Sequence, residues 1–471
     1  MTDQSTASST MPATDPAAGC RCDCACERDR HLFCSGPKRI LALDGGGVRG
    51  ALTVAFLEEI EAILARRLGA PVLLGHWFDL IGGTSTGAII SGALAMGFAA
   101  TDVRRFYHEL APKVFVHPLW RIMGLMAKFD AKLLRDEIRR VIGDCTLGSE
   151  ELITGFALVA KRMDTGSTWL LANNKRSQYW EARGSTVGNK DYDLVSLIRA
   201  STAAPLYFDP EEVVVAADRD GVKGVKGLFV DGGVTPHNNP SLAFLLMALL
   251  DAYRLRWKPG PENLTIVSIG TGTHRARVVP DAIGMGKTAR LAMHAFRSLM
   301  NDVHELAVTQ MQYLGDSLVP WYINGELRDM RDEKPAQGKL FRFIRYDVRL
   351  ELEWINADEE RRSKIKEVFG RELTETDMIR LRSMDDTTII PDLYEIGRIV
   401  AKQQVKEEHW LGDLAQWCDG SRPSAPRREL PLSPAGPSRD SLRYRVMKTL
   451  TEALSHGRAK LVRLMTREPP K

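Results

Sequence analysis

Two glycine-rich turns constrain the fold of this chain more than any other feature of its sequence. The first, "LALDGGGVRG" at 41–50, joins an apolar run to a helical pattern that extends over 48–67. The second, "HWFDLIGGTSTG" at 76–87, leads into an apolar helical pattern over 86–98. Strand, turn and helix recur within about sixty residues, which predicts a three-layer α/β domain with helices on both faces of a sheet.

The rest of the chain divides into segments of different composition. We expect further strands at 152–163, 167–174, 227–233 and 264–272, and helices at 101–111, 131–141, 193–200 and 239–253. The segments are a disordered Cys-rich leader at 1–36, an α/β domain at 37–284, a mainly helical extension at 285–420, a Pro/Ser linker at 421–440 and a basic amphipathic tail at 441–471. Within the extension, "PWYINGEL" and "LFRFIRYDV" indicate a strand pair.

Charge argues against one class of partner and for another. The 471 residues carry a net charge of +4, too small for a dedicated nucleic-acid-binding protein. From Arg427 to Lys471, however, eleven Lys and Arg residues stand against four Asp and Glu residues. This basic tail favours an acidic partner surface, with anionic lipid as the first candidate. Its amphipathic pattern fits a helix lying on a membrane and a helix packed on the protein equally well.

The cysteines and the apolar segments indicate a compartment. Five of the seven cysteines lie within Cys20–Cys34, at spacings that fit neither a secreted disulfide framework nor a zinc knuckle. Spare thiols in a disordered tail are favoured there over a soft-metal site. The N-terminus lacks the apolar region of a signal peptide, and the longest apolar run, at 87–100, is too short to span a bilayer. We expect a cytoplasmic protein that can associate peripherally with membranes.

The second glycine turn carries a candidate nucleophile. Gly83, Ser85 and Gly87 match G-x-S-x-G, and they lie between an expected strand and an expected helix, as that motif requires. A sharp turn would expose the hydroxyl of Ser85, and glycine on either side would let the strand and helix approach closely. The helix N-terminus behind Ser85 would stabilise negative charge that develops on a reacting carbonyl.

A serine hydroxyl needs a base to take its proton. Asp231 is the better candidate, because it lies where an apolar strand meets Gly232 and so at the carboxyl edge of the sheet, as Ser85 does. A partly desolvated carboxylate within hydrogen-bond reach can serve directly as the base. Two alternatives stay open from the residues alone: Asp231 belongs to a plain Asp-Gly turn, or His237 or His274 is the base.

The first glycine turn fits an anion of another kind than a dinucleotide. Its G-x-G-x-x-G spacing lacks an acid at the end of the second strand, and no Gly-Lys-Ser/Thr follows, so the Rossmann and P-loop interpretations both fail. The amides of Gly45, Gly46 and Gly47 suit a single oxyanion, and we interpret them as an oxyanion hole for Ser85. Arg49 either orients this loop, meets a lipid phosphate or forms a structural ion pair.

In this order, "DGGGVRG", "GTSTG" and "DGG" resemble the signatures of patatin-like phospholipases. "SLIRASTAAPLYFDP" at 196–210 and "SIGTG" at 268–272 are similar to further segments of that family, so the resemblance covers roughly residues 38–275. It implies a patatin-like α/β/α sandwich as the catalytic domain at 37–284, hydrolysis of fatty acyl esters in lipids, and no metal or other cofactor. It also implies a Ser85–Asp231 dyad without histidine, and an oxyanion hole at Gly45 to Gly47.

We therefore expect a lipid acyl hydrolase of the phospholipase A or lysophospholipase type that acts through an acyl-enzyme. A membrane-degrading effector gated by a ligand or partner, an acyltransferase and an interaction module without chemistry remain as alternatives. The expected partners are an acyl lipid such as a phospholipid and a membrane surface. A homo-oligomer and a small-molecule activator stay open, and no nucleic acid is expected. The aromatic and Met-rich stretch at 115–129 fits both an acyl-chain wall and ordinary core packing.

Overall fold

The computed structural model describes residues 26–115, 127–218, 223–275, 287–410 and 428. The chain divides into two units, Met1–Leu430 and Pro431–Lys471. All described residues belong to the first unit. The expected basic tail, almost all of the linker and most of the stretch at 115–129 lie outside them.

A single sheet of nine strands forms the centre of the described part. The strand order is β5-β6-β3-β2-β1-β7-β9-β8, and β4 pairs with β3 beside this path. β3, β2, β1, β7, β9 and β8 are mutually parallel, whereas β4 and β6 run antiparallel to β3 and β5 forms a hairpin with β6. The bounds are β1 Lys38–Leu43, β2 Leu80–Thr84, β3 Gly155–Arg162, β4 Thr168–Ala172, β5 Glu211–Ala216, β6 Val225–Asp231, β7 Leu264–Ile269, β8 Gly315–Ser317 and β9 Phe341–Tyr346.

The sheet is buried on both faces, because side chains of its central strands alternate between two cores. On β1, Leu41 and Leu43 enter the larger core, whereas Ile40 and Ala42 enter the smaller one. The helices of the larger core are α2 Gly50–Leu68, α3 Leu74–Trp77, α4 Thr86–Ala95, α5 Ala100–Val114, α6 Ala131–Ile142, α7 Leu194–Thr202, α10 Leu352–Asn356, α11 Glu359–Phe369, α12 Glu375–Leu381 and α13 Ile390–Gln404. The smaller core packs α1 Glu27–Phe33, α8 Ser241–Leu249 and α9 Lys287–Leu314.

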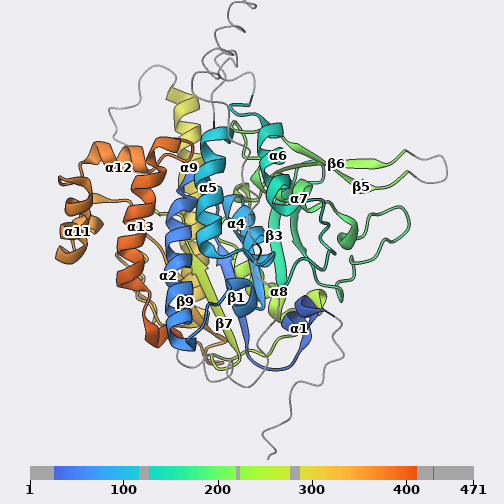
Figure 1. The fold of residues 1–471 in the computed structure, drawn as a ribbon, viewed down its shortest axis with the longest axis horizontal. Helices are drawn as coiled ribbons and strands as arrows, with labels where there is room; N and C mark the ends of the chain where they lie inside the picture. The colour runs from blue at the N-terminus through green and yellow to red at the C-terminus, as the bar shows by residue number, and fades with distance from the viewer. Residues whose placement is uncertain (1–25, 116–126, 219–222, 276–286, 411–427, 429–471) are drawn as a thin grey trace, which may run out of the picture. The chain divides into compact units, whose positions relative to one another are not determined.

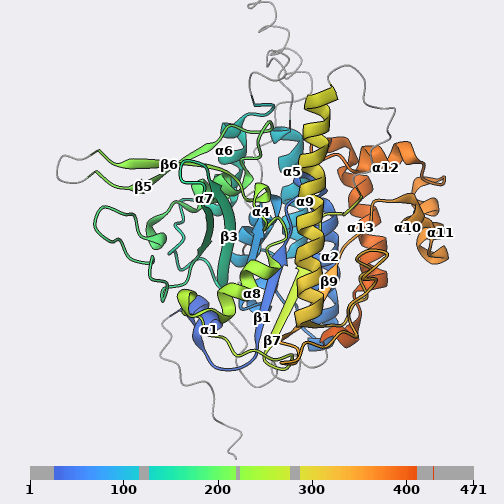
Figure 2. The same cartoon turned by 180° about the vertical axis from the view of Figure 1, so that it is seen from behind.

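The two views of the ribbon show this layering directly. α2 and α5 lie in front of the sheet in Figure 1, with α13 beside α2, and α8 and α9 lie in front of the sheet when the molecule is turned (Figure 2). The predicted α/β/α sandwich is therefore confirmed. The expected elements of the α/β part are present with shifted ends, and one strand, β5, was not expected from the sequence.

The segment expected to be a helical extension also completes the sheet. It contains α9 to α13, as its charged helical patterns predict. β9 lies within "LFRFIRYDV" and pairs with β7 in parallel, so the sheet continues across the boundary expected near residue 285. The prediction of a strand at "PWYINGEL" was wrong. The strand next to β9 is β8, which ends before "PWYINGEL" begins and pairs with β9 in parallel. β9 joins the sheet because Phe343 and Ile344 bury their side chains on opposite faces of it.

The end of the leader is ordered structure, which corrects the expectation that residues 1–36 are disordered throughout. Helix α1 buries Leu32 in the smaller core, and the indole of Trp257 donates a hydrogen bond of 2.9 Å to the Leu32 carbonyl. Arg28 donates to the Gly148 carbonyl at 3.0 Å. Cys34 is disulfide-bonded, so it is not a spare thiol. Among the described residues, no helix is long and apolar enough to cross a membrane.

Candidate active site

Ser85 lies on a strained turn between β2 and α4. Its backbone has φ 55° and ψ −122°, in the left-handed region that residues other than glycine rarely adopt. A Cβ atom on Gly83 would lie 2.2 Å from the carbonyl carbon of Gly87, and one on Gly87 would lie 2.3 Å from the Leu43 oxygen. Both glycines of the motif are therefore required where strand, turn and helix touch.

The Ser85 hydroxyl donates a hydrogen bond of 2.6 Å to Oδ2 of Asp231. The sheet brings these residues together through β3, where Val159 pairs with Thr84 and the next residue, Ala160, pairs with Asp231. The ends of β6 and β2 thus lie on either side of β3, at neighbouring residues of that strand. Asp231, rather than His237 or His274, accepts the hydrogen bond of the Ser85 hydroxyl.

Ser201, on α7, holds the turn from behind. Its hydroxyl accepts a hydrogen bond of 3.0 Å from the Ser85 amide and donates one of 2.7 Å to the Val159 carbonyl. It therefore joins the Ser85 turn to the strand that also positions Asp231. No local pattern in the sequence points to this role of Ser201, although the residue lies in the family-like segment at 196–210.

Burial raises the pKa of Asp231 to about 6, since the carboxylate loses the solvation that water would give its charge. The Ser85 hydroxyl, the Gly233 amide at 2.6 Å and the positive charge of Arg199 act in the opposite direction and favour the ionised form. Arg199 is itself fully buried, and its own pKa is lowered to about 10 by desolvation. The result is a carboxylate that is ionised at neutral pH and basic enough to accept a proton. Only tertiary structure places Arg199 near Asp231, so no local pattern in the sequence indicates its role.

The first glycine turn lies directly beside Ser85. A Cβ atom on Gly45 would lie 3.2 Å from the Ser85 Cβ atom. The amide of Gly45 donates to the Asn238 carbonyl at 3.1 Å, so the expectation that this amide serves an oxyanion is corrected. In the part of the chain that the structure describes, the amides of Gly46 and Gly47 have no such acceptor, and Gly47 lines the same cavity as Ser85.

Arg49 orients this loop from within the protein. It is buried, donates to the Gly272 carbonyl at 2.9 Å and approaches the Gly46 carbonyl at 3.5 Å. It therefore ties the glycine turn to the segment that follows β7. Of the roles left open by the sequence, the contacts match loop orientation.

A buried ion cluster lies behind the glycine turn. Arg345 on β9 contacts both carboxylate oxygens of Asp44 and Oδ2 of Asp347. Asp44, His304 and Asp347 offer ligand atoms within 4.8 Å of one another, a spacing that a metal ion could use. The Arg345 guanidinium already contacts both carboxylates, however, and its positive charge disfavours a cation beside it.

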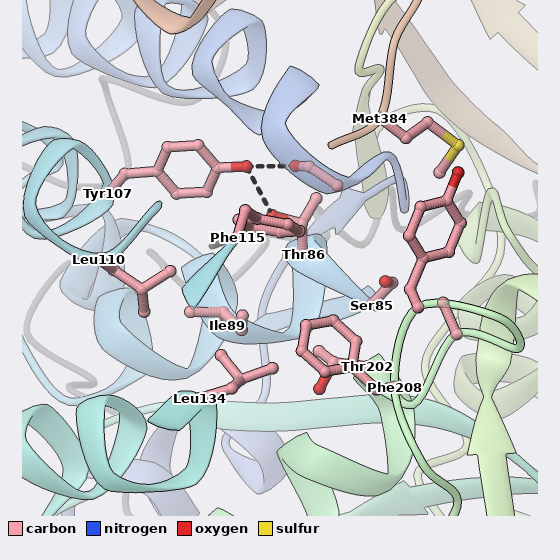
Figure 3. Close-up of a pocket in the computed structure, with 13 residues that line it drawn as sticks. Ser85, Thr86, Ile89, Tyr107, Leu110, Phe115, Leu134, Thr202, Phe208 and Met384 are labelled. Atoms are coloured by element: carbon pink, nitrogen blue, oxygen red, sulfur yellow. Dashed lines mark hydrogen bonds between the residues drawn. The ribbon is translucent and has the colours of Figure 1, made fainter. Parts of the chain in front are cut away.

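An apolar cavity opens at Ser85 (Figure 3). Ile89, Leu110 and Leu134 line one side of it, and Met384 comes from the segment between α12 and α13. The Met384 carbonyl accepts the Val48 amide at 3.0 Å, so this segment also supports the glycine turn. The cavity can hold a hydrocarbon chain while its attached ester lies at Ser85.

Part of this chain is similar to known proteins. A family model described as patatin-like phospholipase matches residues 41–245. A cUMP-AMP-activated phospholipase of Escherichia coli is 30% identical over 236 residues, which are 50% of this chain and 65% of that protein. A cGAMP-activated phospholipase of Escherichia coli strain TW11681 is 29% identical over 239 residues, which are 50% of this chain and 62% of that protein. The chain therefore spans less than two thirds of the length of these relatives.

A solved structure is more distant. VipD from Legionella pneumophila aligns over 79% of this chain and 67% of its own, with 11% identity and a TM-score of 0.30, a likeness too weak to bear on function. The likeness therefore rests on the match to residues 41–245 and on the relatives that share it. Residues 41–245 of this chain are similar to the patatin-like phospholipase family.

Proposed function

We propose that this protein is a lipid acyl hydrolase that cleaves fatty acyl esters of phospholipids through Ser85 and Asp231. The observation that carries the proposal is the 2.6 Å hydrogen bond from the Ser85 hydroxyl to a buried carboxylate, at the entrance of an apolar cavity. Two relatives named as phospholipases support the substrate class.

In the first step, the Ser85 oxygen attacks the ester carbonyl while its proton passes to Oδ2 of Asp231. The Gly233 amide keeps Asp231 oriented through its other oxygen, Oδ1. The tetrahedral intermediate then collapses, and the departing alcohol takes the proton back from Asp231. An acyl-enzyme on Ser85 remains. Water, activated by the same carboxylate, attacks this ester and releases the fatty acid.

The negative charge on the tetrahedral oxygen requires donors that are already in place. We assign this role to the amides of Gly46 and Gly47, assisted by the N-terminus of α4. Each well-placed donor lowers the barrier by about 3 kcal/mol. Contacts of Arg49 and of the Met384 carbonyl keep the glycine turn in position.

The test is fatty acid release from mixed phospholipid vesicles by the full chain, Ser85→Ala and Asp231→Asn. We expect each variant to lose at least about a thousandfold in rate while it stays folded by circular dichroism. Ser91→Ala is the matched control, because Ser91 also lies on the α4 segment but donates only to the Ala88 carbonyl. Asp231→Asn with unchanged activity would refute the dyad and return attention to His237 or His274.

Water and another alcohol compete for the acyl-enzyme, so the same assay separates hydrolysis from acyl transfer. We expect free fatty acid as the product even when glycerol or lysolipid is added in excess. A new ester that forms in place of free fatty acid would make the protein an acyltransferase instead.

A second candidate function concerns regulation. The two relatives are named as activated by cUMP-AMP and by cGAMP, which favours a hydrolase that a cyclic dinucleotide switches on. Under this hypothesis, fatty acid release rises at least tenfold when one of these compounds is added. Full activity without either compound, unchanged by their addition, would contradict it.

Access to lipid in a membrane is a separate proposal, which rests on the sequence of the basic tail. Its excess of Lys and Arg would bind anionic headgroups at the membrane surface. Deletion of residues 440–471 should therefore weaken binding to vesicles that contain anionic lipid at low salt, and leave binding to neutral vesicles as it was. Equal binding of both proteins to anionic vesicles would exclude the tail as an anchor.

A further inference from the structure

A large groove lies at the end of the sheet opposite to Ser85. It is lined by residues at the amino ends of two parallel strands, Lys38 of β1 and Asn263 before β7, together with the segments 175–183 and 254–258. The glycine turn and Ser85 follow the carboxyl ends of β1 and β2 instead. One strand of six residues therefore separates the groove from the active site by about 20 Å.

The groove is strongly basic. Seven of the side chains that line it are Lys or Arg, and Glu181, which pairs with Lys190, is the one acidic residue among them. Most of these cations have no acidic partner in the described part of the chain; they are Arg176, Arg183, Arg254 and Lys258. All four are exposed. Unpaired positive charges that face one space favour an anionic ligand with more than one charge.

The backbone is strained where it presents some of these cations. Arg254 has φ 60° and Arg256 has φ 52°, two of the five positive φ values of non-glycine residues in the described chain. Along 254–258, exposed and buried residues alternate. Leu255 and Trp257 are buried, and the three basic residues on either side of them are exposed. Burial of Leu255 and Trp257 anchors the backbone of this strained segment beside the groove. Strain of this kind collects at binding sites.

Aromatic rings line the groove beside the cations. Phe33, Trp180 and Trp257 contribute to its wall. The guanidinium of Arg176 lies 4.1 Å from the centre of the Phe33 ring, which holds this flat group in place. Aromatic rings and guanidinium planes are the surfaces on which nucleobases stack.

We propose that this groove is a binding site for a nucleotide that carries at least two phosphate groups. The cations match the phosphates, and the aromatic and guanidinium planes match the bases. The space, about 1740 Å³ including the part open to solvent, exceeds what an inorganic anion would fill. The proposal gives the activator hypothesis a site, and in that respect it rests on the proposed function. Binding itself does not depend on lipid hydrolysis.

The headgroup of the lipid substrate is a poor alternative occupant. A phospholipid has only a few bonds between its phosphate and its ester carbonyls, whereas the groove is about 20 Å from Ser85 along β1. A lipid bound by its phosphate in the groove could not place its ester at the nucleophile. The occupant must therefore be a ligand other than the molecule being cleaved.

The experiment is calorimetric titration of the full chain carrying Ser85→Ala, so that the result is independent of catalysis. The probes are cGAMP, cUMP-AMP, pyrophosphate and inositol 1,4,5-trisphosphate, which separate a nucleotide from a bare phosphate and from a lipid headgroup. We expect one of the cyclic dinucleotides to bind at least about tenfold more tightly than the other two kinds of probe. Arg176→Gln and Arg254→Gln should each weaken that binding at least about tenfold, because each removes a charged phosphate contact.

Arg328→Gln is the matched control, since Arg328 is an exposed arginine with φ 55° that lies outside the groove. It should leave the dissociation constant unchanged. The assignment is overturned if no nucleotide binds, if pyrophosphate or the inositol phosphate binds as tightly, or if the groove variants bind like the control variant. Because activity is not measured, none of these outcomes can be confused with a failure of the lipid-hydrolase proposal.

Discussion

Arg345 and Asp44 form a two-armed ion pair inside the protein, although 301 residues separate them in the chain. The two contacts are 3.1 Å for Nη1–Oδ1 and 2.7 Å for Nη2–Oδ2, and both side chains are almost completely buried. Asp44 directly precedes the glycine turn, whereas Arg345 lies beyond the segment at 41–245 that matches the family model. The strand β9 is therefore a structural support of the turn beside Ser85.

Loss of this support should destabilise the protein. Arg345→Leu would leave the carboxylates of Asp44 and Asp347 buried without their cation, at a cost of about 3–5 kcal/mol in the free energy of unfolding. Chemical denaturation with urea measures this change. Arg371→Gln is the comparison, because Arg371 forms a similar pair with Asp377 at the exposed surface, where water screens the charges and little stability is expected to be lost. If Arg345→Leu lost as little free energy of unfolding as Arg371→Gln, the buried pair would contribute nothing to stability.

The pH dependence of kcat/KM should report the pKa of Asp231. Since the base must be ionised, kcat/KM should fall about tenfold per pH unit below a pKa of about 6. An Asp with an ordinary pKa would give this acidic limb of the pH profile about two pH units lower. Arg199→Met should move this limb to higher pH, because the positive charge of Arg199 favours the ionised form. A limb near pH 4 in the wild type, or one that Arg199→Met leaves in place, would assign it to another group.

The same raised pKa makes Asp231 a cost to stability at neutral pH. The folded state binds the Asp231 proton more tightly than the unfolded state, whose pKa is near 3.8, so folding is disfavoured as pH rises through about 6. Asp231→Asn should therefore raise the free energy of unfolding by about 1–3 kcal/mol at pH 8, and the gain should vanish near pH 4. Thermal melts at the two pH values test this. A gain of the same size at both pH values would rule out the titration of Asp231 as its cause.

The apolar cavity should set the preferred length of the acyl chain. Leu134 lines the cavity, so Leu134→Trp would fill part of the space and favour short-chain over long-chain esters by at least about tenfold in kcat/KM. Its neighbour Leu133 is 44% exposed and does not line the cavity, which makes Leu133→Trp a matched control. Rates on p-nitrophenyl esters of increasing chain length give the comparison. An unchanged chain-length profile in Leu134→Trp would mean that the acyl chain lies elsewhere.

Local patterns in the sequence were sufficient to predict the sandwich and to bring Ser85 and Asp231 forward as a pair. Each lies where an apolar run meets glycine. The rule that such junctions collect at the carboxyl edge of a parallel sheet does not hold for Asp231, because β6 runs antiparallel to β3. The two residues meet because Thr84 and Asp231 pair with neighbouring residues of β3. The support around them could not be predicted in this way. Arg345 and Met384 reach the site only through tertiary packing. The Gly45 amide was assigned wrongly because its acceptor, the Asn238 carbonyl, leaves no sequence signal.

The neighbouring register positions Val159 and Ala160 on β3 have a consequence for how this protein can be altered. Because β3 fixes where β2 and β6 end, the connection between β5 and β6 contributes little to the spacing of Ser85 and Asp231. New termini or an inserted domain between β5 and β6 should therefore leave the contact between Ser85 and Asp231 intact. This connection is therefore a suitable attachment point for sensors or targeting modules.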